Sequence, residues 1–482
     1  MAKPSVFSRT ARSGGQLEPN AIGVTEDTII GMASSAPAAS VGLTLAALAA
    51  ATAYGSGPII ILIAIPMLII ANAYRKLNMW NASAGASFEW VGRAINPYLG
   101  FLTGWFMVAA YVLGTLSGVE VLAPSVLAVF GSNSTATWGN IGLDTALGLI
   151  MIVIAVIGIK LTARTQIGMA LVEYVILIVF AIIGFVFVLS HHHGVHPITS
   201  GWASPTGEGG KGSATAGFLI AVFMFTGWDG AIYVNEETQR RRINPGRAVL
   251  IAVALLAVVY FVATVGLQGV VPARELQANA ADAPVFVAQA IGGSGWAKAM
   301  ALSIALSAIA STGAGIVVTA RIVMDMAHRR VLPPTLGLIS RRFSTPAIAS
   351  IVVGLLVVIL TWVYLLATSV EDAFDDVVAI TGLLFSVFYI LTALATIVYY
   401  RRRLANPKDA VMLGILPIAS AVFLAWIVVK SLQEAPGSQR WSLVGILLAG
   451  LVLMFVARFV LRSDFFRTRL ESSPREETPV ED

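Results

Sequence analysis

Three carboxylates lie inside long apolar stretches of the chain, at Glu120, Glu173 and Asp229. An ionisable side chain at membrane depth costs at least ~2.5 kcal/mol on insertion scales, and such residues are usually retained where something binds or titrates. No Lys or Arg is expected in the middle of an apolar stretch to neutralise them. The three carboxylates are therefore the first candidates for the chemistry of this protein.

Asp229 lies between two glycines in the segment Phe225-Thr226-Gly227-Trp228-Asp229-Gly230, midway along an apolar stretch. Glycine adopts backbone geometry that other residues resist, so this segment predicts a helix that is broken where a substrate binds. Trp228 could cover the ligand as an apolar gate or a cation–π face. Asp229 could receive an amine or order the unwound backbone. The alternative is a kinked helix whose Asp is satisfied by neighbouring hydroxyls.

The first apolar stretch is interrupted at Ser34-Ser35-Ala36-Pro37. Proline lacks an amide hydrogen and clashes with the preceding turn, so carbonyls before it are freed. A helix that restarts near Ala38 would point its amides at an anion such as a carboxylate. Proline kinks without a function also occur, but the second break, in the sixth stretch, favours a paired binding site. Interrupted segments at matching positions of two halves are typical of an inverted-repeat transporter.

Glu173 lies about two turns into the fifth apolar stretch. Its carboxylate could titrate for proton coupling, ligate sodium or pair with a substrate cation, and a protonated, hydrogen-bonded Glu is the alternative. Glu120 is near the outer end of the third stretch. Its simplest interpretation is a side chain that extends toward water at the membrane surface. The tract His191-His192-His193 with His196 could suggest a metal cluster, but no carboxylate or Cys accompanies it, and a solvated loop is favoured.

Composition predicts an all-α polytopic membrane protein. The 482 residues are 57% apolar and 12% charged, against ~25% charged in a typical soluble domain. The apolar runs are long enough for helices and are not the short alternations of a barrel. Cysteine is absent, which excludes disulfides and thiolate metal sites. We find no phosphate-binding loop or hydrolase motif, so neither a cofactor nor an enzymatic activity is expected.

Twelve spans divide the chain into loops whose charges test the division. With the N-terminus in the cytoplasm, nearly all of the 31 Lys and Arg residues fall on the inner side, as the positive-inside rule requires. The net charge of +5 therefore follows from topology and does not indicate a nucleic-acid partner. Only these basic residues remain outside: Lys211, Arg274, Lys298, Lys430 and Arg440. The predicted spans are 28–52, 57–75, 98–123, 141–160, 166–190, 213–237, 247–271, 296–320, 346–366, 377–400, 410–429 and 441–461.

Two five-helix repeats are expected at 28–190 and 213–400, followed by helices 11 and 12 at 410–461. Residues 1–27 form a cytoplasmic N-terminal segment, and residues 462–482 form a cytoplasmic polar tail. The tail is expected to be disordered after Ser463, because its composition is polar and charged.

Several stretches, in order from the first span to the ninth, resemble the amino acid–polyamine–organocation (APC) superfamily. The break at 31–37 departs from the Gly-Ser-Gly-like break of many members, and Glu173 stands where some members place a Lys near the ion site. The stretches are Gly31-Met32-Ala33-Ser34-Ser35-Ala36-Pro37, Gly85-Ala86-Ser87-Phe88-Glu89-Trp90-Val91-Gly92-Arg93, Asn96-Pro97-Tyr98-Leu99-Gly100, Gly158-Ile159-Lys160, Phe225 to Gly230, Asn235-Glu236-Glu237-Thr238, Asn244-Pro245, Ala320-Arg321, Leu332-Pro333 and Thr345-Pro346.

The resemblance implies a LeuT-like 5+5 inverted repeat with broken helices 1 and 6. It also implies that the backbone around residues 226–230 lines the amino-group side of the site, and that Ser307, Ser311 and Thr312 lie near Glu173. We therefore expect a secondary transporter of the cell membrane that imports or exchanges an amino acid or small amine by alternating access, with proton coupling through Glu173. Sodium coupling, plain exchange and a polyamine or organic-cation substrate are the alternatives. The expected substrate site comprises Ser34, Ser35, Ala36, Pro37, Ala38, Phe225, Thr226, Gly227, Trp228 and Asp229, with Glu173, Ser311 and Thr312 for coupling.

Overall fold

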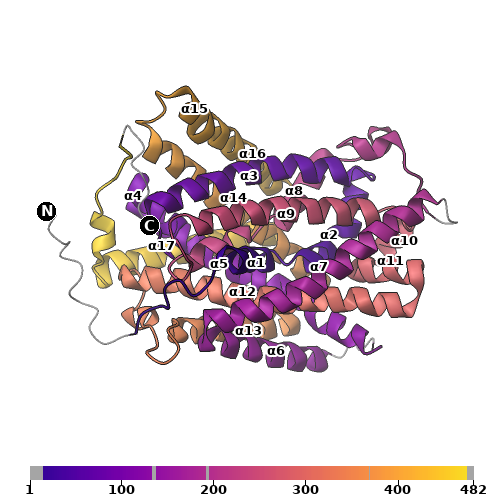
Figure 1. Cartoon of the computed structure of the whole chain (residues 1–482), viewed down its shortest axis with the longest axis horizontal. Coiled ribbons are helices and arrows are strands. Elements are labelled where there is room, and N and C mark those ends of the chain that lie inside the picture. Colours follow the sequence, from indigo (N-terminus) through magenta and orange to yellow (C-terminus); the bar gives the residue numbers. More distant parts are fainter. Residues whose placement is uncertain (1–14, 133–136, 191–194, 368–369, 475–482) are drawn as a thin grey trace.

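The computed structural model describes residues 15–132, 137–190, 195–367 and 370–474. Within these residues the chain is helical, and twelve helical spans are long and apolar enough to cross a membrane. Figure 1 shows the long helices packed side by side along the longest direction of the molecule. The chain is therefore a multi-pass membrane protein, and the prediction of twelve spans is confirmed.

The spans follow the predicted order and differ mainly at their ends. The twelve are α1 with α2 (Val24–Ser34 and Pro37–Thr52), α3 (Ser56–Trp80), α5 (Pro97–Val129), α6 (Thr137–Ile157), α7 (Ile159–Leu189), α8 (Ala214–Met224) with the 3-10 segment Trp228–Val234, α9 (Asn244–Leu267), α12 (Ser294–His328), α13 (Ala347–Ala367), α14 (Val370–Tyr400), α15 with α16 (Pro407–Ala410 and Leu416–Glu434) and α17 (Gly437–Phe455). Three short helices that the sequence did not predict lie between spans: α4 (Ser87–Ala94), α10 (Ala273–Ala278) and α11 (Ala283–Gly292).

The first span is broken where the proline predicts it. Helix α1 ends at Ser34, and Ala36 takes a left-handed conformation with φ of +47°. Helix α2 then begins at Pro37, a position where the missing amide hydrogen of proline costs nothing. The chain therefore enters the membrane, unwinds for two residues and continues as a second helix.

The sixth span is broken at Phe225–Gly227, and its second half is the 3-10 segment Trp228–Val234. Gly227 has φ of +90°, which a side chain rarely allows. A Cβ on Gly227 would lie 2.5 Å from the Ser34 carbonyl oxygen, and one on Gly31 would lie 2.7 Å from the Trp228 carbonyl oxygen. The two breaks therefore pack backbone against backbone.

The eighth span is longer than predicted, and this places Arg321 inside a membrane-spanning helix. The prediction ended that span at residue 320, but α12 continues to His328. The Nε atom of Arg321 lies 2.5 Å from a carboxylate oxygen of Glu237, and both side chains are 1% exposed. The expectation that no basic residue is buried within a span is wrong here, because the ion pair offsets the cost of burying the guanidinium.

The start of the tail is ordered, contrary to the expectation. Residues 463–474 run across the end of the bundle, where the Ser463 hydroxyl donates to the Arg329 carbonyl at 2.6 Å. The Phe465 ring stacks on Phe88 of α4, with centroids 4.5 Å apart, and the Phe466 ring lies 5.1 Å from that of Tyr98 on α5. These two aromatic residues of the polar tail provide the apolar contact that holds it. Residues 475–482 lie outside the described residues. The first described residues, in indigo, and the last described residues, in yellow, lie at the same end of the bundle, which we call the terminal face (Figure 1).

We predict that Gly227→Ala lowers the melting temperature of the purified protein. The added methyl would need a left-handed backbone and would press on the Ser34 carbonyl, at a cost on the order of 1–3 kcal/mol. Gly168→Ala is the control, since a Cβ there meets no heavy atom within 4 Å. Equal melting temperatures for both variants and the parent would contradict the close packing of the breaks.

We also predict that Arg321→Met strongly destabilises the protein, because it leaves the Glu237 carboxylate buried and unpaired. Breaking a buried ion pair costs about 3–5 kcal/mol. Lys160→Met is the control, because the pair of Lys160 with Glu18 has both side chains about half exposed and such pairs contribute about 0–1 kcal/mol. Chemical unfolding measures both, and the double variant Arg321→Met with Glu237→Gln should regain part of the loss. A loss for Arg321→Met no larger than for Lys160→Met would refute this account.

Candidate functional site

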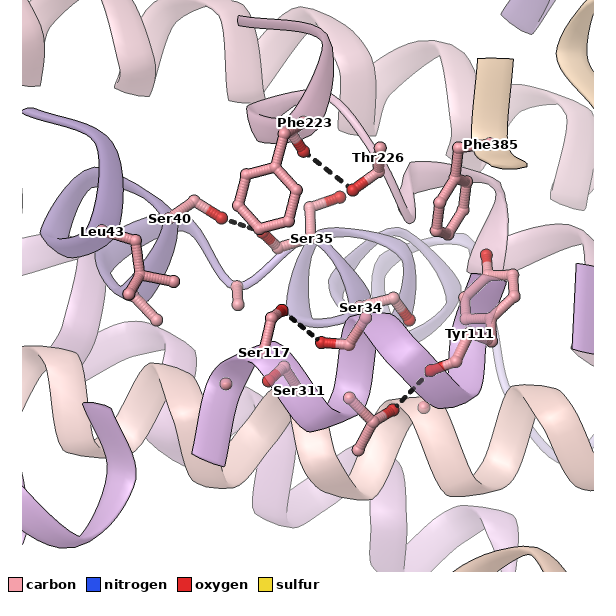
Figure 2. Close-up of a pocket in the computed structure, with 16 residues that line it drawn as sticks. Ser34, Ser35, Ser40, Leu43, Tyr111, Ser117, Phe223, Thr226, Ser311 and Phe385 are labelled. Carbon is pink, nitrogen blue, oxygen red and sulfur yellow. Dashed lines mark hydrogen bonds between the residues drawn. The ribbon is translucent and has the colours of Figure 1, made fainter. Parts of the chain in front are cut away.

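A cavity lies where the two breaks meet α5 and α12. Ser34, Ser35 and Ala36 line it from the first break, and Phe223 and Thr226 line it from the second. Figure 2 shows their side chains gathered around this space, together with residues of α5 and α12. The cavity volume is about 30 Å³, which is room for about two water molecules. An amino acid fits only after the helices around the cavity move apart.

Three further hydroxyls belong to the cavity wall. Thr115 and Ser117 come from α5, and Ser311 comes from α12. Ser40 of α2 and Tyr111 of α5 also line the cavity, and the apolar part of the wall includes Phe223 and Phe385 (Figure 2). The cavity therefore combines small hydroxyl side chains with aromatic rings.

Asp229 lies beside the cavity but does not line it. Its carboxylate accepts hydrogen bonds from the Tyr233 hydroxyl at 2.5 Å and from the Tyr389 hydroxyl at 2.7 Å, and the side chain is fully buried. Tyr111 adds a donor to the Gly227 carbonyl at 3.4 Å. In this structure, Asp229 braces the second break against α14 and is satisfied by hydroxyls.

Of the four neighbours of Asp229 in the predicted site, three are packed away from the cavity and only Thr226 lines it. Trp228 is fully buried and stacks on Tyr389, with ring centroids 5.0 Å apart. Phe225 meets Tyr260 edge to face at 5.2 Å. Gly227 contacts the first break through its backbone. Thr226 alone of this segment faces the cavity.

Glu173 connects α7 to the start of α2. Its carboxylate accepts a hydrogen bond from the Ala38 amide at 3.0 Å, and the side chain is buried. Ser303 on α12 donates to the Glu173 carbonyl at 3.0 Å. The amides at a helix N-terminus attract negative charge, and here the chain places its own carboxylate on them. Pro37 and Ala38 are not part of the cavity wall.

The two hydroxyl residues predicted for coupling, Ser311 and Thr312, differ in whether they face the cavity. Ser311 and Thr312 both donate to the Ala308 carbonyl, at 3.1 and 2.9 Å. Ser311 faces the cavity, whereas Thr312 does not line it. Ser303, which the sequence did not single out, is the α12 hydroxyl that bonds to residue 173.

Sequence reasoning missed the contribution of α5 and α14 to the site. On α5, Tyr111, Gly114, Thr115 and Gly118 recur at helical spacing and so share one face. Small and hydroxyl-bearing residues are typical of helix contacts within membranes, and this pattern was the available signal. Tyr233 and Tyr389, the partners of Asp229, carried no such signal.

The histidine tract lies mostly outside the described residues, at 191–194. Within the described part of the chain, no group of three or more His, Asp or Glu residues could hold a metal ion. His196 stacks on Tyr54 at 3.7 Å and pairs with Glu208 at 2.9 Å. Partial burial raises the pKa of Glu208, but hydrogen bonds from Thr199 and His196 outweigh it and hold that pKa below the ordinary value. The side chain of Glu120 also lies outside the described residues.

The family model for amino acid permeases matches residues 27–460, which is most of the chain. The chain belongs to the amino acid permease family. Vacuolar cationic amino acid transporter 4 of Arabidopsis thaliana is 23% identical to this permease over 304 residues, covering 59% of this chain and 49% of that protein. This chain thus spans about half the length of that relative.

Two other relatives match over more of the chain. Asc-type amino acid transporter 1 of Mus musculus is 23% identical over 395 residues, covering 80% of this chain and 71% of that protein. The low-affinity putrescine importer PlaP of Escherichia coli (strain K12) is 24% identical over 400 residues, covering 80% of this chain and 82% of that protein. The predicted resemblance to the APC superfamily is thereby confirmed.

Solved structures show the same fold. MhsT in complex with L-phenylalanine matches with a TM-score of 0.58 and 17% identity, covering 85% of this chain and 99% of that one. A manganese transporter of Eremococcus coleocola matches with a TM-score of 0.59 and 13% identity, covering 91% of this chain and 94% of that one. Both are LeuT-fold transporters, so the predicted fold with broken helices 1 and 6 is confirmed.

Proposed function

We propose that this permease is a secondary transporter that carries an amino acid by alternating access through the cavity between the two breaks. The observation that carries the proposal is the meeting of both breaks, backbone against backbone, at one small cavity. Discontinuous helices at a midplane site are the usual binding device of LeuT-fold transporters. The names of the relatives, which include amino acid transporters and a putrescine importer, support a substrate of this kind.

The substrate carboxylate meets amides near the start of α2, and its ammonium meets carbonyls around residues 226–229. The bond from the Ala38 amide to Glu173 supports the first half of this arrangement, because it marks this helix start as one that attracts a carboxylate; the amide is open to the substrate only after Glu173 releases it. Ser35 and Ala36 face the cavity and bring backbone of the first break to it. Asp229 acts indirectly, by holding the second break in place through its two tyrosines.

Proton coupling is assigned to Glu173. Its carboxylate bridges α7 and the start of α2, so its charge stabilises one relative position of the two helices. Protonation removes the charge that the helix start attracts and frees α2 to move relative to α7. Substrate and proton would then act on the same segment of the first span. Uncoupled exchange is the alternative for this step.

We further propose that the permease lies in the cell membrane with both termini in the cytoplasm, which would make the terminal face the inner side. The distribution of Lys and Arg supports this orientation. A polyamine or organic cation is the second candidate substrate, favoured by the match to the putrescine importer.

Reconstitution in liposomes tests the coupling role. We predict that amino acid uptake rises with an inwardly directed proton gradient, and that Glu173→Gln abolishes this rise while exchange of substrate continues. Glu275→Gln on α10, where the side chain is exposed, is the matched control and should keep the full response.

Two outcomes count against these proposals separately. An unchanged gradient response in Glu173→Gln would refute the coupling role alone. If the reconstituted parent protein moves neither amino acids nor amines, the transport proposal itself fails.

A further inference from the structure

The hydroxyls that line the cavity share a feature that bears on which amino acid is carried. On the side of the two breaks, each hydroxyl donates its proton to a backbone carbonyl nearby in sequence. Ser34 donates to the Ile30 carbonyl at 2.9 Å, and Thr226 donates to the Phe223 carbonyl at 2.8 Å. Ser35 and Ser40 do the same, toward Gly31 at 3.4 Å and Ser35 at 2.8 Å.

The opposite wall repeats the pattern (Figure 2). Thr115 donates to the Tyr111 carbonyl and Ser117 to the Gly114 carbonyl, both at 2.8 Å. Ser311 donates to the Ala308 carbonyl at 3.1 Å. Every serine and threonine on the described cavity wall thus has its donor engaged within its own segment.

A hydroxyl carries one donor and two acceptor lone pairs. Since the donors are engaged with the backbone, the oxygens offer lone pairs to whatever occupies the cavity. Acceptors from both walls can be satisfied only by a ligand that brings hydrogen-bond donors. The ammonium of an amino acid supplies three donors at the second break, and the wall formed by α5 and α12 leaves acceptors for the side chain.

The described wall carries no charged side chain. The two nearby carboxylates are engaged elsewhere, Asp229 with two tyrosines and Glu173 with the Ala38 amide. A second positive charge on the ligand would enter this buried site without a counter-charge, which is costly. The wall is also narrow, since a Cβ on Gly315 would lie 2.1 Å from the Thr115 hydroxyl oxygen.

We propose that this permease selects a small α-amino acid whose side chain is uncharged and donates a hydrogen bond, of which threonine and serine are the simplest members. The proposal rests on the transport function proposed above and specifies its substrate. Thr115, Ser117 and Ser311 are the residues that set this preference. Valine, which has the shape of threonine without the donor, is disfavoured, and so are lysine and putrescine.

Competition for uptake in proteoliposomes of the full chain tests the proposal. Unlabelled threonine should compete with labelled threonine at a concentration at least ~10-fold lower than valine requires, because valine leaves the wall acceptors unpaired. Lysine and putrescine should compete no better than valine. Equal competition by valine, or stronger competition by lysine or putrescine, would overturn the assignment of substrate class. A protein that moves none of these compounds would instead refute the transport function itself.

A matched pair of variants locates the preference on α5. Thr115→Val keeps the shape of the side chain and should bring the competition by threonine and valine to within about threefold of each other. Thr103→Val on the same helix is the control, because its hydroxyl also donates to a backbone carbonyl, that of Leu99, at 2.7 Å and does not line the cavity. Ser311→Ala provides a second test should Thr115→Val fail to fold. An unchanged preference in a folded wall variant would remove these residues from the specificity role.

Discussion

The structure depends on one constraint, which is that a broken helix inside a membrane must find partners for its freed backbone groups. Side chains from four different spans meet this requirement at the two breaks. Ser40 of α2 and Tyr260 of α9 donate to the Ser35 carbonyl, at 2.8 and 3.3 Å. Tyr111 of α5 donates to the Gly227 carbonyl, and Glu173 of α7 accepts from the first amide of α2. These four buried polar side chains are therefore placed where the backbone is irregular.

The same constraint explains why the cavity is uncharged although carboxylates surround it. The carboxylates of Asp229 and Glu173 are each hydrogen-bonded to groups that hold a break in place, and the carboxylate of Glu237 pairs with Arg321. What remains for a ligand is backbone and small hydroxyls, which recognise shape and donors more than charge. In the site proposed above, substitution of a few wall residues would therefore change selectivity while the supporting carboxylates keep their partners.

Sequence reasoning succeeded where the signal is local. Hydropathy located the twelve spans, and Pro37 and Gly227 located the breaks, because these features depend on few neighbouring residues. It failed where a distant partner decides the outcome. Asp229 is held by Tyr389, which lies 160 residues along the chain, and the end of the eighth span was misplaced because the charge of Arg321 is tolerated only beside Glu237. The docked tail depends in the same way on the contact of Phe465 with α4.

Polar contacts between distant segments also distinguish the two ends of the cavity. Toward the terminal face, the second break continues into Glu237, which is tied to α12 by the buried pair with Arg321. Asp325 of α12 accepts from Ser83 at 2.9 Å, and Glu89 of α4 pairs with Arg329. The alternating access proposed above would require these contacts to separate during each cycle, and the separated charges would then be hydrated or find new partners. Opening toward the terminal face would therefore be limited by how well water or new partners replace these contacts, since a buried charge left unpaired is costly.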